Sequence, residues 1–149
     1  MYERVRVPGQ AGGTQAISIA EVVELELLDP MCGSTRFGSD FVYRSSDPFA
    51  VTVVFRSEYD EVRWTFAREL LVTGVHEPTG VGDVQLWPCL DDAGNAIVMI
   101  ELHAPAGSVL VQAKSRDVAA FVHRMLAAVP LGAEELHVDV DASLAALLA

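Results

Sequence analysis

The side chains that most often bind metals or perform acid–base catalysis are scattered along this sequence. None of the four histidines has a second histidine or a cysteine at the short spacing of a metal site. His137 is the best placed, because it lies in an acidic run that could hold a divalent cation, although a solvated acidic run is the favoured interpretation. The histidines are His76, His103, His123 and His137, and the acidic neighbours of the last are Glu134, Glu135, Asp139 and Asp141.

Two further patterns suggest binding sites on first reading, but neither is complete. Gly80-Val81-Gly82 resembles half of a phosphate-binding loop, but the third glycine is missing and a predicted strand follows where a helix is required. Trp64 and Trp87 fall on predicted strands, where packing into the core is favoured over stacking on bases. No serine-hydrolase elbow, Walker lysine or H-E-x-x-H motif occurs. The sequence therefore assigns no catalytic, cofactor-binding or metal-binding residue, and we expect a protein without enzymatic activity or a cofactor.

Composition narrows the class of partner. The 149 residues suit one domain, and 51% of them are hydrophobic, which is enough for a sizeable core. The formal net charge of -11 disfavours binding to nucleic acid or to anionic lipid. There is no signal peptide and no apolar run long enough to span a bilayer, so we expect a cytoplasmic protein with no direct membrane insertion and with Cys32 and Cys89 reduced.

The elements that must position these side chains follow from the hydrophobic period. Residues 1–14 are predicted to be a mobile arm, or an edge extension that orders against a partner, and residues 15–149 a single domain. A period of two predicts about seven strands, with a bulge or a break near residues 20–22 of the first. Ala67–Thr73 is a predicted helix that Gly74 ends, Ser115 is a predicted cap of a helix up to Val129, and a short helix is expected near the C-terminus. The predicted strands are 15–28, 40–43, 49–56, 62–66, 83–88, 96–103 and 108–113, which makes the fold class α+β.

A long stretch of the chain resembles a known family. The pattern runs through DPFAVTVVF (47–55), WTFARELLVTGVHEPTGVGDVQLWP (64–88), PAGSVLVQA (105–113) and VPLGAEELHVDVDASLAALL (129–148). These segments are similar to the SsgA-like sporulation and cell-division proteins of actinomycetes, over roughly residues 40–148. The resemblance implies a whirly-like fold of two antiparallel sheets packed with helices, assembled as a homotrimer. It also implies recruitment of FtsZ to the division septum and partnership with a second, SsgA-type family member.

The family signature and the C-terminus supply the candidates for protein interaction. Arg68, Glu69 and His76 could face a partner, or could equally form local ion pairs of about 0–1 kcal/mol. Leu144, Leu147 and Leu148 form a stripe too short to be stable alone, so it must pack on its own sheet or on another subunit, with the first favoured.

Two other functions stay open at this point. One is a whirly-like single-stranded nucleic-acid-binding protein, which would need a basic and aromatic face within an acidic whole. The other is an unrecognised enzyme or small-ligand protein, which would need a deep pocket with convergent polar groups.

Overall fold

The computed structural model describes residues 2–4, 16–29, 31, 33–56 and 60–138. Its elements follow one another as nine strands, two α-helices and one 3-10 helix. In order they are β1 (Tyr2–Arg4), β2 (Ile17–Asp29), β3 (Gly33–Arg44), β4 (Ala50–Arg56), β5 (Glu61–Ala67), α1 (Arg68–Gly74), β6 (Thr79–Val81), β7 (Val84–Leu90), β8 (Ala96–Ala104), β9 (Gly107–Lys114), α2 (Ser115–Ala128) and η1 (Glu134–His137).

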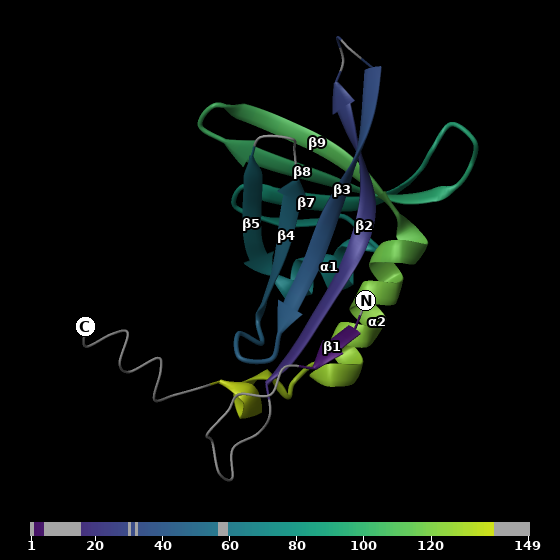
Figure 1. Cartoon of the computed structure of the whole chain (residues 1–149). Coiled ribbons are helices and arrows are strands. Elements are labelled where there is room, and N and C mark those ends of the chain that lie inside the picture. Colours follow the sequence, from purple (N-terminus) through teal and green to yellow (C-terminus); the bar gives the residue numbers. More distant parts are fainter. Residues whose placement is uncertain (1, 5–15, 30, 32, 57–59, 139–149) are drawn as a thin grey trace.

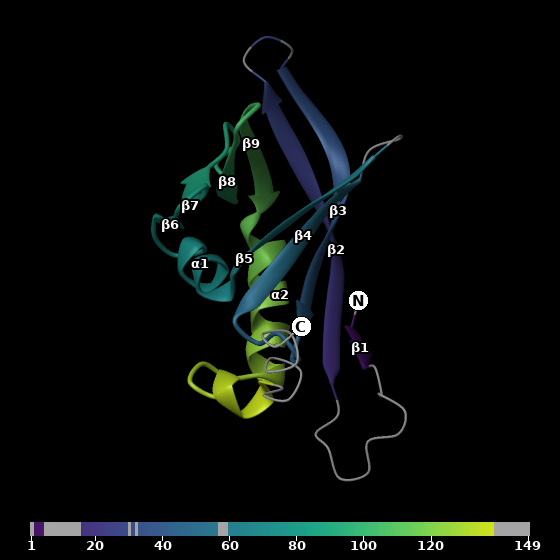
Figure 2. The same cartoon turned by 90° about the vertical axis from the view of Figure 1, so that its left-hand side faces the viewer.

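All nine strands belong to one antiparallel sheet, in the order β5-β4-β3-β2-β9-β8-β7-β6, with β1 paired to β2. The α+β class is confirmed, but the expectation of two sheets is wrong. Strands β2–β5 form one antiparallel meander and strands β6–β9 a second one. The two meanders join because β2 pairs with β9 over Leu25–Leu27 and Val111–Ala113. The sheet is strongly curled, and its halves lie on either side of α2 (Figures 1 and 2).

The core fills the inside of this curl. Val118, Phe121 and Met125 of α2 are fully buried at the predicted helical spacing. Phe121 meets Phe41 of β3 edge to face, with ring centroids 5.7 Å apart. The helix therefore holds the two halves of the sheet together. The predicted cap is wrong, because the cap position is Lys114, which makes no side-chain capping hydrogen bond, and Ser115 is the first residue of the helix.

Strand β2 differs from its prediction in an informative way. It pairs with β3 in one unbroken register from Ser18 opposite Arg44 to Asp29 opposite Gly33, so there is no bulge or break near residue 20. Ile19, Val23 and Leu25 alternate into the core, and Glu21 occupies the same face between them. Its carboxylate reaches Arg124 of α2 at 2.6 Å, which explains how an acid fits on a buried face.

Two other predictions change at the sheet edges. The short strand expected at 40–43 is the end of β3, which begins at Gly33. Within the predicted N-terminal arm, Tyr2–Arg4 pairs with Ile17–Ile19 of β2, and the remainder of residues 1–14 lies outside the described residues. The mobility of that arm stays a prediction.

Candidate functional site

Arg68, the first residue of α1, is buried rather than displayed. Its side chain is 2% exposed and connects three elements. Its Nη1 donates to the carbonyl oxygen of Val129 at 2.7 Å, and its Nη2 contacts the carboxylate of Glu134 at 2.6 Å and the carbonyl oxygen of Pro130 at 3.3 Å. The guanidinium also lies 5.4 Å from the ring centroid of Tyr43. We call Arg68, Tyr43 and Glu134 the arginine anchor.

The dipoles of two helices act on the charge of Arg68, one against it and one in its favour. A cation at the N-terminus of α1 opposes that helix's own dipole. The same guanidinium, however, reaches the carbonyl of Val129, directly after the C-terminus of α2, whose last turn has no basic residue of its own. Arg68 thus supplies the missing cation to α2 and fixes α1 against it.

The surroundings of the other two members of the anchor shift their pKa values in opposite directions. The hydrogen bond from Arg68 lowers the pKa of Glu134, so this carboxyl remains charged near neutral pH. Burial raises the pKa of Tyr43 to about 12, and its hydroxyl donates to the carbonyl oxygen of Pro48 at 3.0 Å. An ion pair this deep is expensive to form unless its hydrogen bonds are made. Most of them are, since Arg68 Nε is the one buried side-chain N or O atom of the described residues without a partner.

The structure separates the residues that the sequence grouped as interaction candidates. Arg68 faces inward and forms the ion pair that was the alternative interpretation, although its partner is distant in sequence. Glu69 and His76 are exposed at opposite ends of α1 and are accessible to a partner. Leu144, Leu147 and Leu148 lie outside the described residues. The contact role of Glu69, His76 and these leucines stays a prediction.

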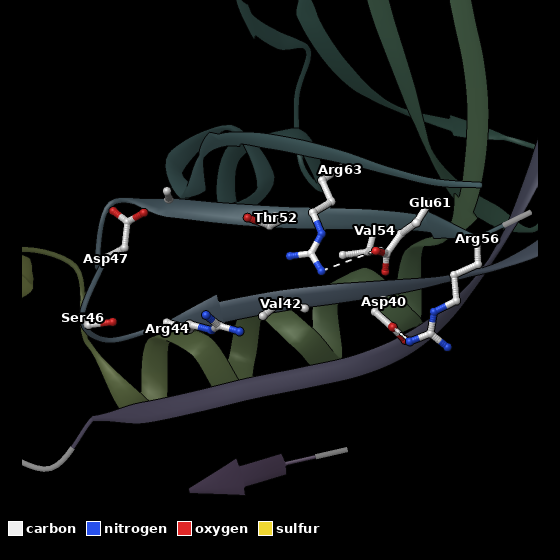
Figure 3. Close-up of a pocket in the computed structure, with 11 residues that line it drawn as sticks. Asp40, Val42, Arg44, Ser46, Asp47, Thr52, Val54, Arg56, Glu61 and Arg63 are labelled. Atoms are coloured by element: carbon white, nitrogen blue, oxygen red, sulfur yellow. Dashed lines mark hydrogen bonds and ion pairs between the residues drawn. The ribbon is translucent and has the colours of Figure 1, made fainter. Parts of the chain in front are cut away.

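A hollow lined by several arginines lies over the outer side of β3, β4 and β5 (Figure 3). Arg44, Arg56 and Arg63 line it, and so do three acids, Asp40, Asp47 and Glu61. Arg56 is paired with Asp40, and Arg63 lies 3.5 Å from Glu61. The hollow therefore carries equal numbers of positive and negative side chains. A groove that tracks a phosphate backbone needs a clear excess of cations, which this hollow lacks.

A serine–histidine–glutamate cluster lies on the outer face of β8 and β9. His103 Nδ1 is 2.7 Å from Ser108 Oγ, and His103 Nε2 is 2.7 Å from Glu101 Oε1. The residue types are those of a hydrolytic triad, in which histidine activates the serine. Here His103 is nearly half exposed and Ser108 is exposed as well. The cluster is explained by cross-strand pairing of His103 with Ser108.

The remaining sequence candidates form no metal site among the residues that the structure describes. No group of three or more histidine, cysteine, aspartate or glutamate side chains converges there. His137 ends η1, while Asp139 and Asp141 lie outside the described residues. Cys89 is an exposed free thiol. Within the described part of the chain, neither helix has the length and apolar character needed to cross a bilayer.

Sequence reasoning missed the arginine anchor because its three members are far apart in the chain. A charged residue in a helix formed by FARELL is expected on the surface. One local signal was available: Arg68 stands where β5 passes directly into α1, so its neighbours Phe66 and Leu70 are both buried.

Comparison with known proteins places this fold among cell-division proteins. The family model described as the Streptomyces sporulation and cell division protein SsgA matches residues 38–134. A sporulation-specific cell division protein SsgB of Frankia casuarinae is 41% identical, over 88% of this chain and 92% of its own length. The SsgB of Streptomyces coelicolor is 44% identical, over 72% of this chain and 78% of its own length.

Two solved structures share the fold. One is an SsgB structure from work on mutations that correlate with longitudinal cell division during sporulation of Streptomyces coelicolor. It has a TM-score of 0.79 and 35% identity, covering 85% of this chain and 99% of that one. The other is an SsgA-like sporulation-specific cell division protein of Thermobifida fusca. It has a TM-score of 0.79 and 34% identity, covering 92% of this chain and 98% of that one.

Proposed function

Because the chain belongs to the SsgA family of sporulation and cell division proteins, we propose that it is a non-enzymatic scaffold that recruits FtsZ to future septa. The observation that carries the proposal is its similarity to proteins named SsgB over most of its length. On this proposal the protein acts in the cytoplasm at the division septum. It binds FtsZ and an SsgA-type family member, and it uses no cofactor.

The geometry supports docking rather than chemistry. The arginine anchor is a buried polar cluster that connects β3, α1 and the end of α2. Glu69 is exposed next to Arg68 in the first turn of α1, and His76 is exposed in the turn that follows the helix. A rigid frame with accessible charged side chains suits a protein that presents a fixed surface to partners.

Self-association is part of the same proposal. We expect a homotrimer with a whirly-like arrangement of subunits, as the family resemblance implies. β5 and β6 stand at the two ends of the main strand order, and subunit contacts would cover such edges. Analytical ultracentrifugation over a range of concentrations tests this directly. A monomer at all concentrations would remove the trimer from the proposal without touching FtsZ binding.

The first experiment is co-sedimentation of the purified protein with FtsZ from the same organism, with and without GTP. Direct recruitment predicts saturable pelleting that depends on polymer. The absence of pelleting over a wide concentration range would show that recruitment is indirect or needs another component.

A pair of variants then tests the candidate surface. Glu69→Ala with His76→Ala alters exposed side chains of α1 and its following turn, and Arg116→Ala alters an exposed charge at the start of α2. Weaker pelleting of the first variant alone would assign α1 to the FtsZ contact. Equal pelleting of both would exclude Glu69 and His76 from it.

A further inference from the structure

The sheet has a second apolar surface, on the side facing away from the core. Strand β8 is apolar on both faces over part of its length. Val98 and Ile100 point into the core, while Ile97 and Met99 point outward yet are only 5% and 7% exposed. They form the floor of a hollow of about 760 Å³ between the end of the β2–β3 hairpin and the turn from β7 to β8, both visible in Figure 1. A strand with two apolar faces is typical of a strand covered on both.

The walls of this hollow, which we call the outer groove, continue the apolar character. Leu28 of β2 and Leu110 of β9 are half-buried on its sides, and Leu90 at the end of β7 is 66% exposed at its mouth. A concave surface of this size, mainly apolar and with a few polar groups at its margin, is the usual form of a binding site for a side chain or a short segment. Leu90 costs free energy in water and would gain from being covered.

The rim of the outer groove carries charge of one sign. Glu26, Asp29, Asp91 and Asp92 line it, and none of the residues lining it is a lysine or arginine. The acids on its two sides are held in place. Asp91 Oδ1 accepts hydrogen bonds from the backbone N–H groups of Ala93 and Asn95, at 3.0 and 2.8 Å, and Glu26 accepts one from the Gln112 side chain at 3.0 Å. The backbone hydrogen bond from Asn95 also lowers the pKa of Asp91, which favours the charged form of this carboxyl.

From this combination we propose that the outer groove docks a segment of a protein partner whose apolar anchor side chains are flanked by lysine or arginine. The anchors would pack against Leu90 and the half-buried Leu28 and Leu110, above the floor of the groove. The basic flanks would neutralise carboxylates that otherwise lose water on binding. An acidic segment, a phosphate backbone or an anionic membrane is repelled by the same rim. The inference rests on the proposed scaffold function and names the chemistry of its partner.

Cys89 lines the groove, and its exposed thiol can report whether the groove is occupied. In a Cys32→Ser background, maleimide labelling reports on Cys89 alone. The probes are two labelled synthetic peptides with the same leucine and phenylalanine centre, one flanked by arginines and the other by glutamates. The proposal predicts that the arginine peptide binds saturably by fluorescence anisotropy, binds more weakly as salt rises, and slows labelling of Cys89. The glutamate peptide should not bind saturably and should not slow labelling of Cys89.

Matched variants locate the binding. Leu90→Glu is expected to weaken binding of the arginine peptide at least about tenfold, because it places a charge where an anchor must pack. Val81→Glu makes the same change at a residue that is 69% exposed and outside the groove, and should leave binding unchanged. Likewise Asp92→Lys should weaken binding, and Asp83→Lys, also on an exposed aspartate, should not. Thermal melts of all four confirm folding.

The outcomes separate the groove from the scaffold function. No saturable binding of the arginine peptide, or equal binding to the Leu90→Glu variant, overturns the groove proposal whatever FtsZ does. Groove-dependent peptide binding without FtsZ pelleting overturns direct FtsZ recruitment but supports the groove. When both assays are positive, loss of pelleting in Leu90→Glu but not in Val81→Glu assigns the groove to FtsZ.

Discussion

At the scale of single residues, the arginine anchor explains more of the molecule than the exposed charges around it. Arg68, Tyr43 and Glu134 come from three separated parts of the chain and meet where α1 begins and α2 ends. By contrast, Arg36 and Glu24 are 3.9 Å apart and mostly exposed, which makes their attraction weak. Burial decides the difference, because a charge that loses water must recover the cost from its partners.

The anchor predicts a large effect from one substitution. Arg68→Met keeps the approximate length of the side chain but removes the donor to the carbonyl of Val129 and the cation beside Glu134, whose carboxylate keeps the backbone N–H of Gly132. We expect the free energy of unfolding to fall by about 3 kcal/mol, measured by urea denaturation. Adding Glu134→Gln should recover part of the lost free energy of unfolding, since it removes the carboxylate charge that no longer has a cationic partner. The control, Arg36→Met, should change it by about 0–1 kcal/mol. A similar small effect at Arg68 would contradict the anchor's role.

Tyr43 predicts how stability depends on alkaline pH. Its pKa is raised to about 12 in the folded protein from the usual value of 10.0. Between these values the unfolded chain loses the phenolic proton and the folded protein keeps it, so the unfolded state binds fewer protons and stability falls as pH rises. Below about pH 10 Tyr43 contributes no pH dependence. Denaturation curves from neutral to strongly alkaline pH check this, and Tyr43→Phe should flatten the alkaline decline. An unchanged decline in that variant would assign it to other groups.

At the scale of elements, the hydrophobic period predicted most strands and α2, and failed where a polar residue occupies a buried face. Glu21 interrupts the alternation of β2 and suggested a break, but its pair with Arg124 lets the strand continue. The first half of β3 escaped prediction because Ser34, Thr35 and Arg36 are all exposed. Their strand conformation comes from the β2 ladder, which only the folded chain supplies.

The packing of α1 on β7 depends on one residue without a side chain. A Cβ at Gly74 would stand 2.7 Å from the Cβ of Leu86, which is closer than real carbons approach. Gly74→Ala should therefore displace α1 and cost about 1–3 kcal/mol of stability. Gly38→Ala is the matched control, because a Cβ there meets nothing within 4 Å. Thermal denaturation of both variants measures the difference, and equal melting temperatures would show that α1 adjusts freely.

At the scale of the whole molecule, charge distribution decides between the candidate partners. The net charge is -11, and the hollow lined by several arginines is neutral within itself. The outer groove is acidic around an apolar floor. The net charge follows from composition alone. The pairing of Arg56 with Asp40 and of Arg63 with Glu61 could not be predicted without the register of the strands. The surface suits proteins with basic segments better than polyanions.

This distribution predicts that the protein does not bind single-stranded nucleic acid. A labelled oligonucleotide should show no saturable change in anisotropy at low salt, where phosphate contacts are strongest. Converting Asp40 and Asp47 to Asn and Glu61 to Gln would free Arg56 and Arg63 from their partners and, with Arg44, leave three positive side chains and no acid in the hollow. This variant should gain weak binding that salt abolishes. Salt-sensitive binding by the unmodified protein would restore the nucleic-acid alternative.

The three-residue ladder between β2 and β9 has a consequence for how the chain folds. Every other pair of neighbouring strands is consecutive in sequence and can form as a local hairpin. Contacts between nearby residues form quickly, whereas distant ones wait for a large loop to close. The two meanders can therefore assemble independently. We expect the last step of folding, in which the meanders join, to be limited by the pairing of Leu25–Leu27 with Val111–Ala113 while α2 packs between the two halves of the sheet.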